Sequence, residues 1–226
     1  MLQQTKNLVN SLFISKSLHE VPELAEFCRQ HSISLIARSL IRFEAVPFQV
    51  KRPYEVIFFS SIRAAEFFLK TETIDQKARV ACIGRKTAEK LEKQGVSLSF
   101  IGEKSGNPEE VAQDFAAWLN DRNLLIPQSD ISKRSMIKGL NPDQVEEVVV
   151  YRTISDCVPI ENTDVYVFTS PSNFQGFISC NERPKGKLIA WGTSTRASME
   201  QAHCIPAFTL ERSELSELIS LLHNEL

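Results

Sequence analysis

The sequence predicts an α/β protein made of two similar domains, and three observations support this. Apolar segments of strand length alternate along the chain with amphipathic segments of helical length. Strands as uniformly apolar as VIFFS at 56–60 are typical of parallel sheets that helices cover on both faces. The third observation is that the pattern occurs twice within 226 residues, a length that accommodates two small domains.

The individual elements follow from their composition and their boundaries. The expected strands are 12–15, 56–60, 79–84, 124–127, 148–151, 165–169 and 187–191. The expected helices are 21–31, 64–70, 85–95, one that begins at 107, one that follows the strand ending at 191, and 212–223. Gly95 closes the third helix, because glycine is favoured just beyond a helix end. Asn107 and Pro108 open the fourth, as an N-cap residue followed by proline at the first helical position.

The repeat is visible as three pairs of similar segments. VIFFSSIRAAEFF starts at residue 56 and VYVFTSPSNFQGF 109 residues later, at 165. RVACIGRKTAEKLEKQG starts at 79 and KLIAWGTSTRASMEQAH 108 residues later, at 187. The weakest pair is LFISKS at 12 and LLIPQS at 124, which are 112 residues apart. Three pairs in the same order indicate that one α/β unit occurs twice, and we expect a ligand in the cleft between the two domains.

Small polar residues follow most of the predicted strands. Ligands of parallel sheets bind beyond the carboxyl ends of the strands, where the unpaired N–H groups of helix N-termini favour anions. The candidate substrate-binding residues at these positions are Ser60, Gly84, Thr87, Ser129, Ser170, Ser172, Gly192, Thr193 and Thr195. Basic side chains follow them at Arg63, Arg85, Lys86, Lys133, Arg134 and Arg196. Each hydroxyl alone could be an ordinary helix cap, but their occurrence in both repeats indicates a ligand with several anionic groups.

Composition excludes several classes of protein. Lys and Arg number 26 against 28 Asp and Glu, so the basic excess of a nucleic-acid-binding protein is missing. The five cysteines are far apart and form no CxxC pair, which argues against a zinc site and against disulfides and favours reduced thiols. The N-terminus lacks the features of a signal peptide, and no apolar run is long enough to span a bilayer. We therefore expect a cytoplasmic protein with no nucleic-acid or membrane partner.

Tyr151 is the one candidate catalytic residue. The sequence contains no dinucleotide fingerprint, phosphate-binding loop or nucleophile elbow, so we expect neither a cofactor nor a metal. Tyr151 ends a predicted strand near the junction of the two repeats. Its ring could simply pack at that junction, or its phenol could face the ligand and donate a hydrogen bond or a proton.

Five short motifs resemble those of the uroporphyrinogen-III synthase family, in the same order and with similar spacing. They are FFS at 58–60, IGRKTAEKL at 83–91 with Gly95 after it, VYRT at 150–153, FTSPS at 168–172 and WGTSTRA at 191–197. The departures are Phe59 for threonine, Thr193-Ser194 for Pro-Thr, Arg196 for a small residue, and Cys204 for the glycine that closes the helix.

This resemblance implies two flavodoxin-like parallel-sheet domains joined by a two-stranded linker. The chain would begin in one domain, cross to the second and return. Domain 1 would comprise residues 1–38 and 153–226, domain 2 residues 41–149, and the crossings would lie near 38–43 and 149–153. The repeat by itself would equally allow two contiguous halves.

The resemblance also implies an activity. Members of this family are cofactor-independent hydro-lyases of haem biosynthesis, which cyclise hydroxymethylbilane to uroporphyrinogen III with loss of water and inversion of ring D. The substrate is a linear tetrapyrrole with eight carboxylates, which suits the many predicted helix N-termini. Tyr151 matches the family's tyrosine, which is thought to assist departure of the hydroxyl. Arg152 would neutralise a carboxylate or pair with a surface acid, and the family suggests a monomer.

Two other classes of protein share paired α/β domains. The first is an anionic-ligand-binding protein of two domains without catalytic turnover. The second is a sugar-nucleotide transferase, but that class should carry a glycine-rich phosphate loop and an acidic residue for the ribose, and the sequence shows neither.

Overall fold

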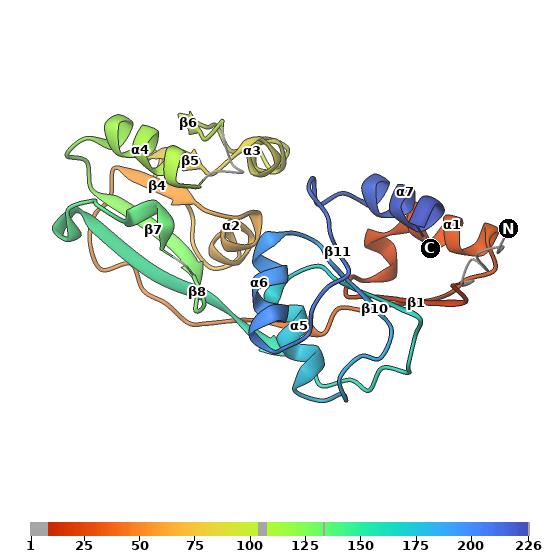
Figure 1. Ribbon diagram of the computed structural model, residues 1–226. Coiled ribbons are helices and arrows are strands. Elements are labelled where there is room, and N and C mark those ends of the chain that lie inside the picture. Colours follow the sequence, from red (N-terminus) through yellow and green to blue (C-terminus); the bar gives the residue numbers. More distant parts are fainter. Residues whose placement is uncertain (1–8, 104–107, 133, 226) are drawn as a thin grey trace, which may run out of the picture. The chain divides into compact units, whose positions relative to one another are not determined.

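The computed structural model describes residues 9–103, 108–132 and 134–225 (Figure 1). The chain divides into two compact units. Unit 1 contains the described residues up to Arg42 together with those from Ile154 onward, and unit 2 contains Phe43–Thr153. Each unit holds a sheet whose paired central strands are parallel, so the predicted α/β class is confirmed.

Unit 1 is a three-layer arrangement around a five-stranded sheet. The strands are β1 (Ser11–Ile14), β2 (Ser34–Ala37), β9 (Val165–Phe168), β10 (Lys187–Ala190) and β11 (Phe208–Thr209). Their spatial order β2-β1-β9-β10-β11 is the 2-1-3-4-5 order of flavodoxin-like sheets. The helices α1 (Pro22–Gln30) and α7 (Leu215–Glu225) cover one face, α5 (Pro171–Ile178) and α6 (Thr193–Gln201) cover the other, and the 3-10 turn η1 is Leu18–Glu20.

Unit 2 has the same layers around a six-stranded sheet. Its strands are β3 (Ile41–Ala45), β4 (Val56–Phe59), β5 (Arg79–Cys82), β6 (Phe100–Ile101), β7 (Leu124–Ser129) and β8 (Val145–Ser155), in the order β3-β8-β7-β4-β5-β6. The helices α2 (Ile62–Leu69) and α3 (Arg85–Glu92) pack on one face. On the other face lie α4 (Pro108–Leu119) and the turn η2 (Ser135–Ile137), and a further turn, η3, is Pro142–Gln144.

Apolar strand residues build the core of each unit. All four side chains of β4 are fully buried, two against α2 and α3 and two against α4. Burial of one such side chain contributes about 1.5–3 kcal/mol, and truncation of Phe58 to alanine would cost about 3–5 kcal/mol. This burial on both faces is the physical reason for the uniform apolarity of the predicted strands.

The sequence repeat is reproduced in the strand pairing. Leu12 of β1 lies opposite Val165 of β9, and the corresponding Leu124 of β7 lies opposite Val56 of β4. Arg79 and Lys187 likewise occupy equivalent places beside Val56 and Val165. All three pairs of similar segments therefore fall at matching sheet positions, including the weakest pair.

Each copy of the repeat is shared between the two units. The first copy supplies β1 and β2 to unit 1 but β4, β5 and β6 to unit 2, and the second copy does the reverse. The units are therefore not contiguous halves of the chain. The neighbouring strands β3 and β8 contain the two places where the chain passes between the units, after Arg42 and after Thr153.

Helix ends agree with the prediction in part. Gly95 follows α3 with a φ of 81°, and the Val96 N–H donates to the Leu91 carbonyl, as a glycine cap requires. In α6 the corresponding left-handed residue is His203, with a φ of 56°, so the assignment of this position to Cys204 was wrong by one residue. α4 begins at Pro108 as predicted, whereas Asn107 lies outside the described residues.

The expectation that all cysteines are reduced is wrong. Cys157 and Cys180 form a disulfide with a Cα–Cα distance of 5.5 Å, while Cys28, Cys82 and Cys204 are free and buried. The pair escapes a motif search because 23 residues separate its members. Folding brings the segment after β8 to the end of α5, where the Asn181 side chain hydrogen-bonds the backbone at two points of that segment.

None of the described helices combines the length and the apolar character needed to cross a membrane.

Candidate active site

A cavity of about 230 Å³, with both polar and apolar lining residues, lies at the carboxyl ends of β4 and β7 and beside Tyr151 of β8 in unit 2. Its polar lining consists of Ser60, Ser61, Gln128, Ser129, Ser132, Arg134, Ser135 and Tyr151, and its apolar lining of Ile83, Ile126, Met136 and Ile137. Three of the candidates, Ser60, Ser129 and Tyr151, are thus brought together around one cavity. The position agrees with the rule that parallel sheets bind ligands beyond their carboxyl ends.

The first turn of α2 borders this cavity. The N-cap of α2 is Ser61, whose Oγ accepts a hydrogen bond of 3.2 Å from the Ala64 N–H. Ser60, one residue earlier, lines the cavity without serving as the cap. For Ser60, the alternative reading as a simple helix cap is therefore excluded.

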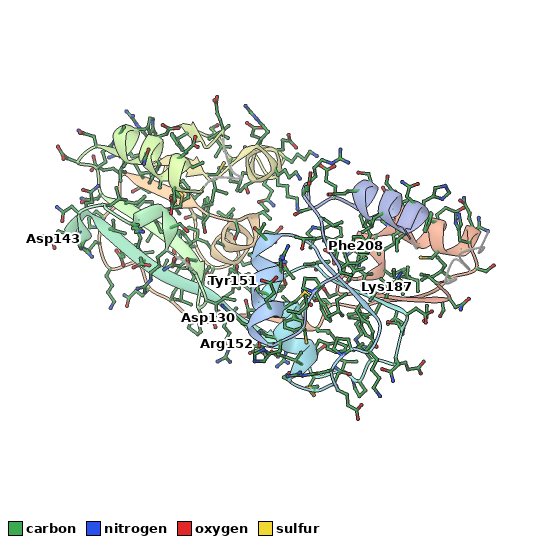
Figure 2. The ribbon with its side chains drawn as sticks, in the orientation of Figure 1. Asp130, Asp143, Tyr151, Arg152, Lys187 and Phe208 are labelled. Carbon is green, nitrogen blue, oxygen red and sulfur yellow. A yellow bond between two sulfur atoms is a disulfide. The ribbon has the colours of Figure 1, made fainter. Side chains whose placement is uncertain are left out.

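Tyr151 lies on β8 (Figure 2). Only 7 % of its surface is exposed. The Phe67 ring stacks on its ring at 5.1 Å between centroids, and Phe43 meets it edge-on at 5.8 Å. The ring thus packs among aromatic side chains of unit 2, and the residue also lines the cavity. None of the described residues hydrogen-bonds the Tyr151 hydroxyl, which leaves this group available to a ligand.

A register shift places Tyr151 beside Ser129. Along β7 and β8, Gln128 pairs with Val149, but the next residue, Ser129, pairs with Tyr151. Val150 is therefore an extra residue in β8, which is a β-bulge. Bulges re-aim side chains next to functional sites, and this one brings the tyrosine level with the serine.

Among the described residues that line the cavity, Arg134 is the one with a positively charged side chain. Its Nε lies 3.0 Å from a carboxylate oxygen of Glu147, which also accepts a hydrogen bond from the buried Gln128 amide. The Arg134 backbone is left-handed, with a φ of 55°, and its N–H donates to the Ser132 hydroxyl. These contacts place an exposed guanidinium, paired with Glu147, at a cavity lined by several hydroxyls, where it could also bind a carboxylate of a ligand.

Arg152, unlike Arg134, is not among the residues that line the cavity. Its guanidinium lies 3.0 Å from the Glu44 carboxylate on the neighbouring strand β3, and the pair is partly exposed. Of the two roles considered for Arg152, the structure shows the pairing with a surface acid.

The remaining candidates of unit 2 belong to α3. Gly84 is its N-cap, with an extended backbone and no side chain to satisfy the first turn. The half-buried Thr87 follows in that first turn, and the preceding Ile83 lines the cavity. Gly84 is therefore adjacent in sequence to a lining residue, but neither Gly84 nor Thr87 is among the residues that line the cavity.

Five candidates occupy the matching edge of unit 1. Ser170 is the N-cap of α5, and its Oγ accepts hydrogen bonds from the Asn173 backbone and amide at 3.2 and 3.1 Å. Ser172 lies in the first turn of α5, Gly192 is the N-cap of α6, and Thr193 and Thr195 are in the first turn of α6. Thr195 is 2 % exposed and matches Thr87 in the repeat, but neither is a cap, since a glycine takes that position in both helices.

Several residues of the cavity lining were not among the candidate substrate-binding residues, although Arg134 was noted as a basic side chain that follows its strand. Gln128, Ser132, Arg134 and Ser135 come from strand β7 and the segment after it. The signal that could have found them is the hydroxyl-rich stretch SDISKRS, which directly follows the predicted strand. Lys133, also part of that stretch, lies outside the described residues. In the part of the chain that the structure describes, no three His, Cys, Asp or Glu side chains gather as a metal site would require.

Comparison with known proteins identifies the family. Two similar solved structures are the uroporphyrinogen-III synthetase of Helicobacter pylori 26695, with a TM-score of 0.70 at 16% identity, and a mutant uroporphyrinogen III synthase of Thermus thermophilus, with 0.61 at 14%. Each alignment covers 94% of this chain and 97% of the other, and it supports the fold. No curated protein sequence matches the chain. The family model of uroporphyrinogen-III synthase HemD matches residues 22–220, which is most of the chain, and the protein therefore belongs to the uroporphyrinogen-III synthase family.

Proposed function

We propose that the unit 2 cavity holds the reacting end of hydroxymethylbilane and that Tyr151 donates a hydrogen bond or a proton to its leaving hydroxyl. Family membership supplies the reaction, since the protein is a lyase that cyclises hydroxymethylbilane to uroporphyrinogen III without a cofactor. The observation that carries the proposal is a tyrosine with an unshared hydroxyl in a cavity lined by serines and one arginine.

The chemistry requires a donor at one oxygen of the substrate. Loss of the hydroxyl as water leaves an electrophilic methylene, and a phenol that donates to the departing oxygen reduces the charge that develops on it. The methylene then attacks the substituted position of ring D, and the spiro intermediate opens and recloses with that ring inverted. Without an enzyme the chain closes directly to isomer I, so much of the catalysis consists of holding the substrate in the less favoured geometry.

The other candidates serve the carboxylates in this proposal. Ser60 and Ser129 donate from the cavity wall, and Arg134 supplies the positive charge. The N-terminal turns of α3, α5 and α6 offer further contacts, through Gly84, Thr87, Ser170, Ser172, Gly192, Thr193 and Thr195. Helix N-termini suit this task because their N–H groups favour anions, and eight carboxylates need many such contacts.

We further propose that the two units act as the two domains of a monomeric cytoplasmic enzyme. A net charge of −2 without a basic excess fits a small-molecule substrate better than nucleic acid. The Cys157–Cys180 bond is unusual for the cytoplasm, so its retention in protein isolated from cells tests the compartment.

The decisive assay measures which isomer forms. The protein is incubated with freshly prepared hydroxymethylbilane, the products are oxidised, and the isomers are resolved by chromatography. We expect isomer III in excess of an enzyme-free blank. A two-domain binding protein without turnover would instead give only isomer I, in the amount of the blank, and that result would refute the proposed activity.

The role of Tyr151 is tested separately with Tyr151→Phe. Loss of one neutral hydrogen bond should lower kcat about threefold to tenfold, whereas loss of a general acid should lower it about 100-fold or more. The matched control is Tyr54→Phe in the same unit, where the hydroxyl only accepts a hydrogen bond from the Asp75 N–H. Turnover of Tyr151→Phe equal to that of the control would remove Tyr151 from the mechanism.

A further inference from the structure

We propose that Phe67 is a positioning residue for Tyr151, acting through an aromatic layer along one face of α2. This inference rests on the proposed function, because it assumes that the Tyr151 hydroxyl takes part in turnover. The aromatic layer consists of Phe43, Tyr151 and Phe67, with Arg63 and Lys70 as its two cations.

The layer follows from the spacing of residues along α2. Arg63, Phe67 and Lys70 are separated by four and three positions, so they share one face of the helix and its C-terminal cap. The buried residues Ala64, Ala65 and Phe68 form the other face, toward the core. The face that carries Phe67 is therefore left to contact β8 at Tyr151 and β3 at Phe43.

Two rings hold the phenol from different directions. Phe67 stacks on Tyr151 with an angle of 22° between the ring planes, and Phe43 approaches it edge-on at 77°. Stacked and edge-on contacts are the favoured geometries of aromatic pairs. The Arg63 guanidinium lies 3.5 Å from the centre of the Phe43 ring and the Lys70 ammonium 4.9 Å from that of Phe67, and such cation–π contacts hold the flanking rings in turn.

The β-bulge explains why Tyr151 can reach this layer. Successive side chains of a regular strand point to opposite faces, so Val150 and Tyr151 should face different layers. Because of the register shift at Ser129, both instead belong to the buried cluster beneath α2 and α3. Tyr151 is thereby turned toward Phe67 at the point where it also lines the cavity.

Ring packing is what orients the hydroxyl. Within the described residues, the Tyr151 hydroxyl has no hydrogen-bond partner that would fix its direction. Phe67 is not among the residues that line the cavity, so its loss should leave the carboxylate contacts intact. Its removal should let the phenol sample other rotamers and lower the fraction of enzyme with the donor in place, which affects kcat more than KM.

The test is a double-mutant cycle of Phe67→Leu and Tyr151→Phe. Phe67→Leu keeps an apolar side chain but removes the ring, and we expect kcat to fall roughly threefold to tenfold, as for loss of an aromatic pair, with KM unchanged. In the Tyr151→Phe background the same substitution should change kcat by less than about twofold, because contacting residues that act together are not additive. Phe67→Tyr retains the stack and should restore most of kcat.

Phe48→Leu is the matched control. Phe48 is half-buried in the same cluster and stacks on Phe68 at 5.6 Å, without a ring contact to Tyr151. It should lower stability about as much as Phe67→Leu while leaving kcat unchanged.

Two results would overturn the inference. One is a loss of kcat in Phe67→Leu no larger than in Phe48→Leu, and the other is an equal loss in the wild-type and Tyr151→Phe backgrounds. If Tyr151→Phe is slow but Phe67→Leu is normal, only the positioning role fails. If Tyr151→Phe turns over at the wild-type rate, the proposed role of Tyr151 fails, and this inference fails with it.

Discussion

Reduction of the Cys157–Cys180 disulfide should lower the free energy of unfolding by about 3 kcal/mol. The loop that it closes spans 23 residues, from the end of β8 through β9 and α5. Cross-linking a chain across a loop of this length removes about 11 cal/mol/K of entropy from the unfolded state, which corresponds to the stated energy at 25 °C. Both cysteines belong to unit 1, so the change should appear in the unfolding of that unit.

The native structure itself should survive reduction. The Asn181 side chain accepts a hydrogen bond of 2.7 Å from the Ile160 N–H and donates one of 3.0 Å to the Val158 carbonyl. These contacts keep the segment after Cys157 in place without the covalent bond. The expected effect is therefore a lower urea midpoint, with a slope equal to or slightly larger than that of the oxidised protein, because the reduced unfolded chain is less compact.

The assay combines urea unfolding with a count of thiols. Unfolded, unreduced protein should react at three thiols, Cys28, Cys82 and Cys204, and at all five after reduction. A variant with Cys157→Ser and Cys180→Ser should unfold at the midpoint of the reduced protein and should not respond to reductant. Five reactive thiols before reduction, or the same midpoint with and without reductant, would refute the reasoning.

Three further outcomes are expected. Ser170→Ala removes the α5 cap and should lower the free energy of unfolding by about 1 kcal/mol in urea; a loss of substrate affinity beyond this would assign Ser170 a carboxylate contact. Hydrogen bonds from the Asn10 and Ser11 backbone and the Ser11 hydroxyl hold the pKa of Asp164 below its usual range. Its stabilisation is thus present above the unfolded-state pKa and lost as the pH falls through the folded value, so Asp164→Asn should flatten the acid limb of the stability profile; an unchanged limb would contradict this. Arg134→Gln should raise KM severalfold at low salt and less at high salt, whereas a salt-independent KM equal to wild type would exclude a carboxylate contact.

The central strands could be predicted from sequence because their signal is local. The four residues of β4 are apolar and buried on both faces, and every strand predicted from such a run is present. The short strands β2, β3, β6 and β11 were not predicted. They lie at or near sheet edges and have half-exposed side chains, so their pairing with a neighbour decides their conformation more than their own composition does.

Only those residues of the candidate site that are identified by their position after a strand could be predicted from the sequence. Ser60 and Ser129 were found because each follows or ends its own strand. The Arg134–Glu147 pair joins positions thirteen residues apart on different elements, and the stack of Phe67 on Tyr151 depends on a β-bulge. Such contacts form only when the sheet has folded, so the pattern of residues within one segment does not predict them.

The two units differ at the strand that carries Tyr151. Ile14 of β1 pairs with Ala37 of β2, the last residue of that strand, and the equivalent Ile126 of β7 pairs with Glu147 of β8. β8 continues to Ser155, and Tyr151 lies in this continuation, which β2 lacks. The polar strand ends therefore recur in both units, whereas the tyrosine occurs once. Hydroxymethylbilane likewise carries many similar carboxylates but a single leaving hydroxyl. A repeated fold suits the repeated carboxylates, and a tyrosine that occurs once suits the single leaving hydroxyl.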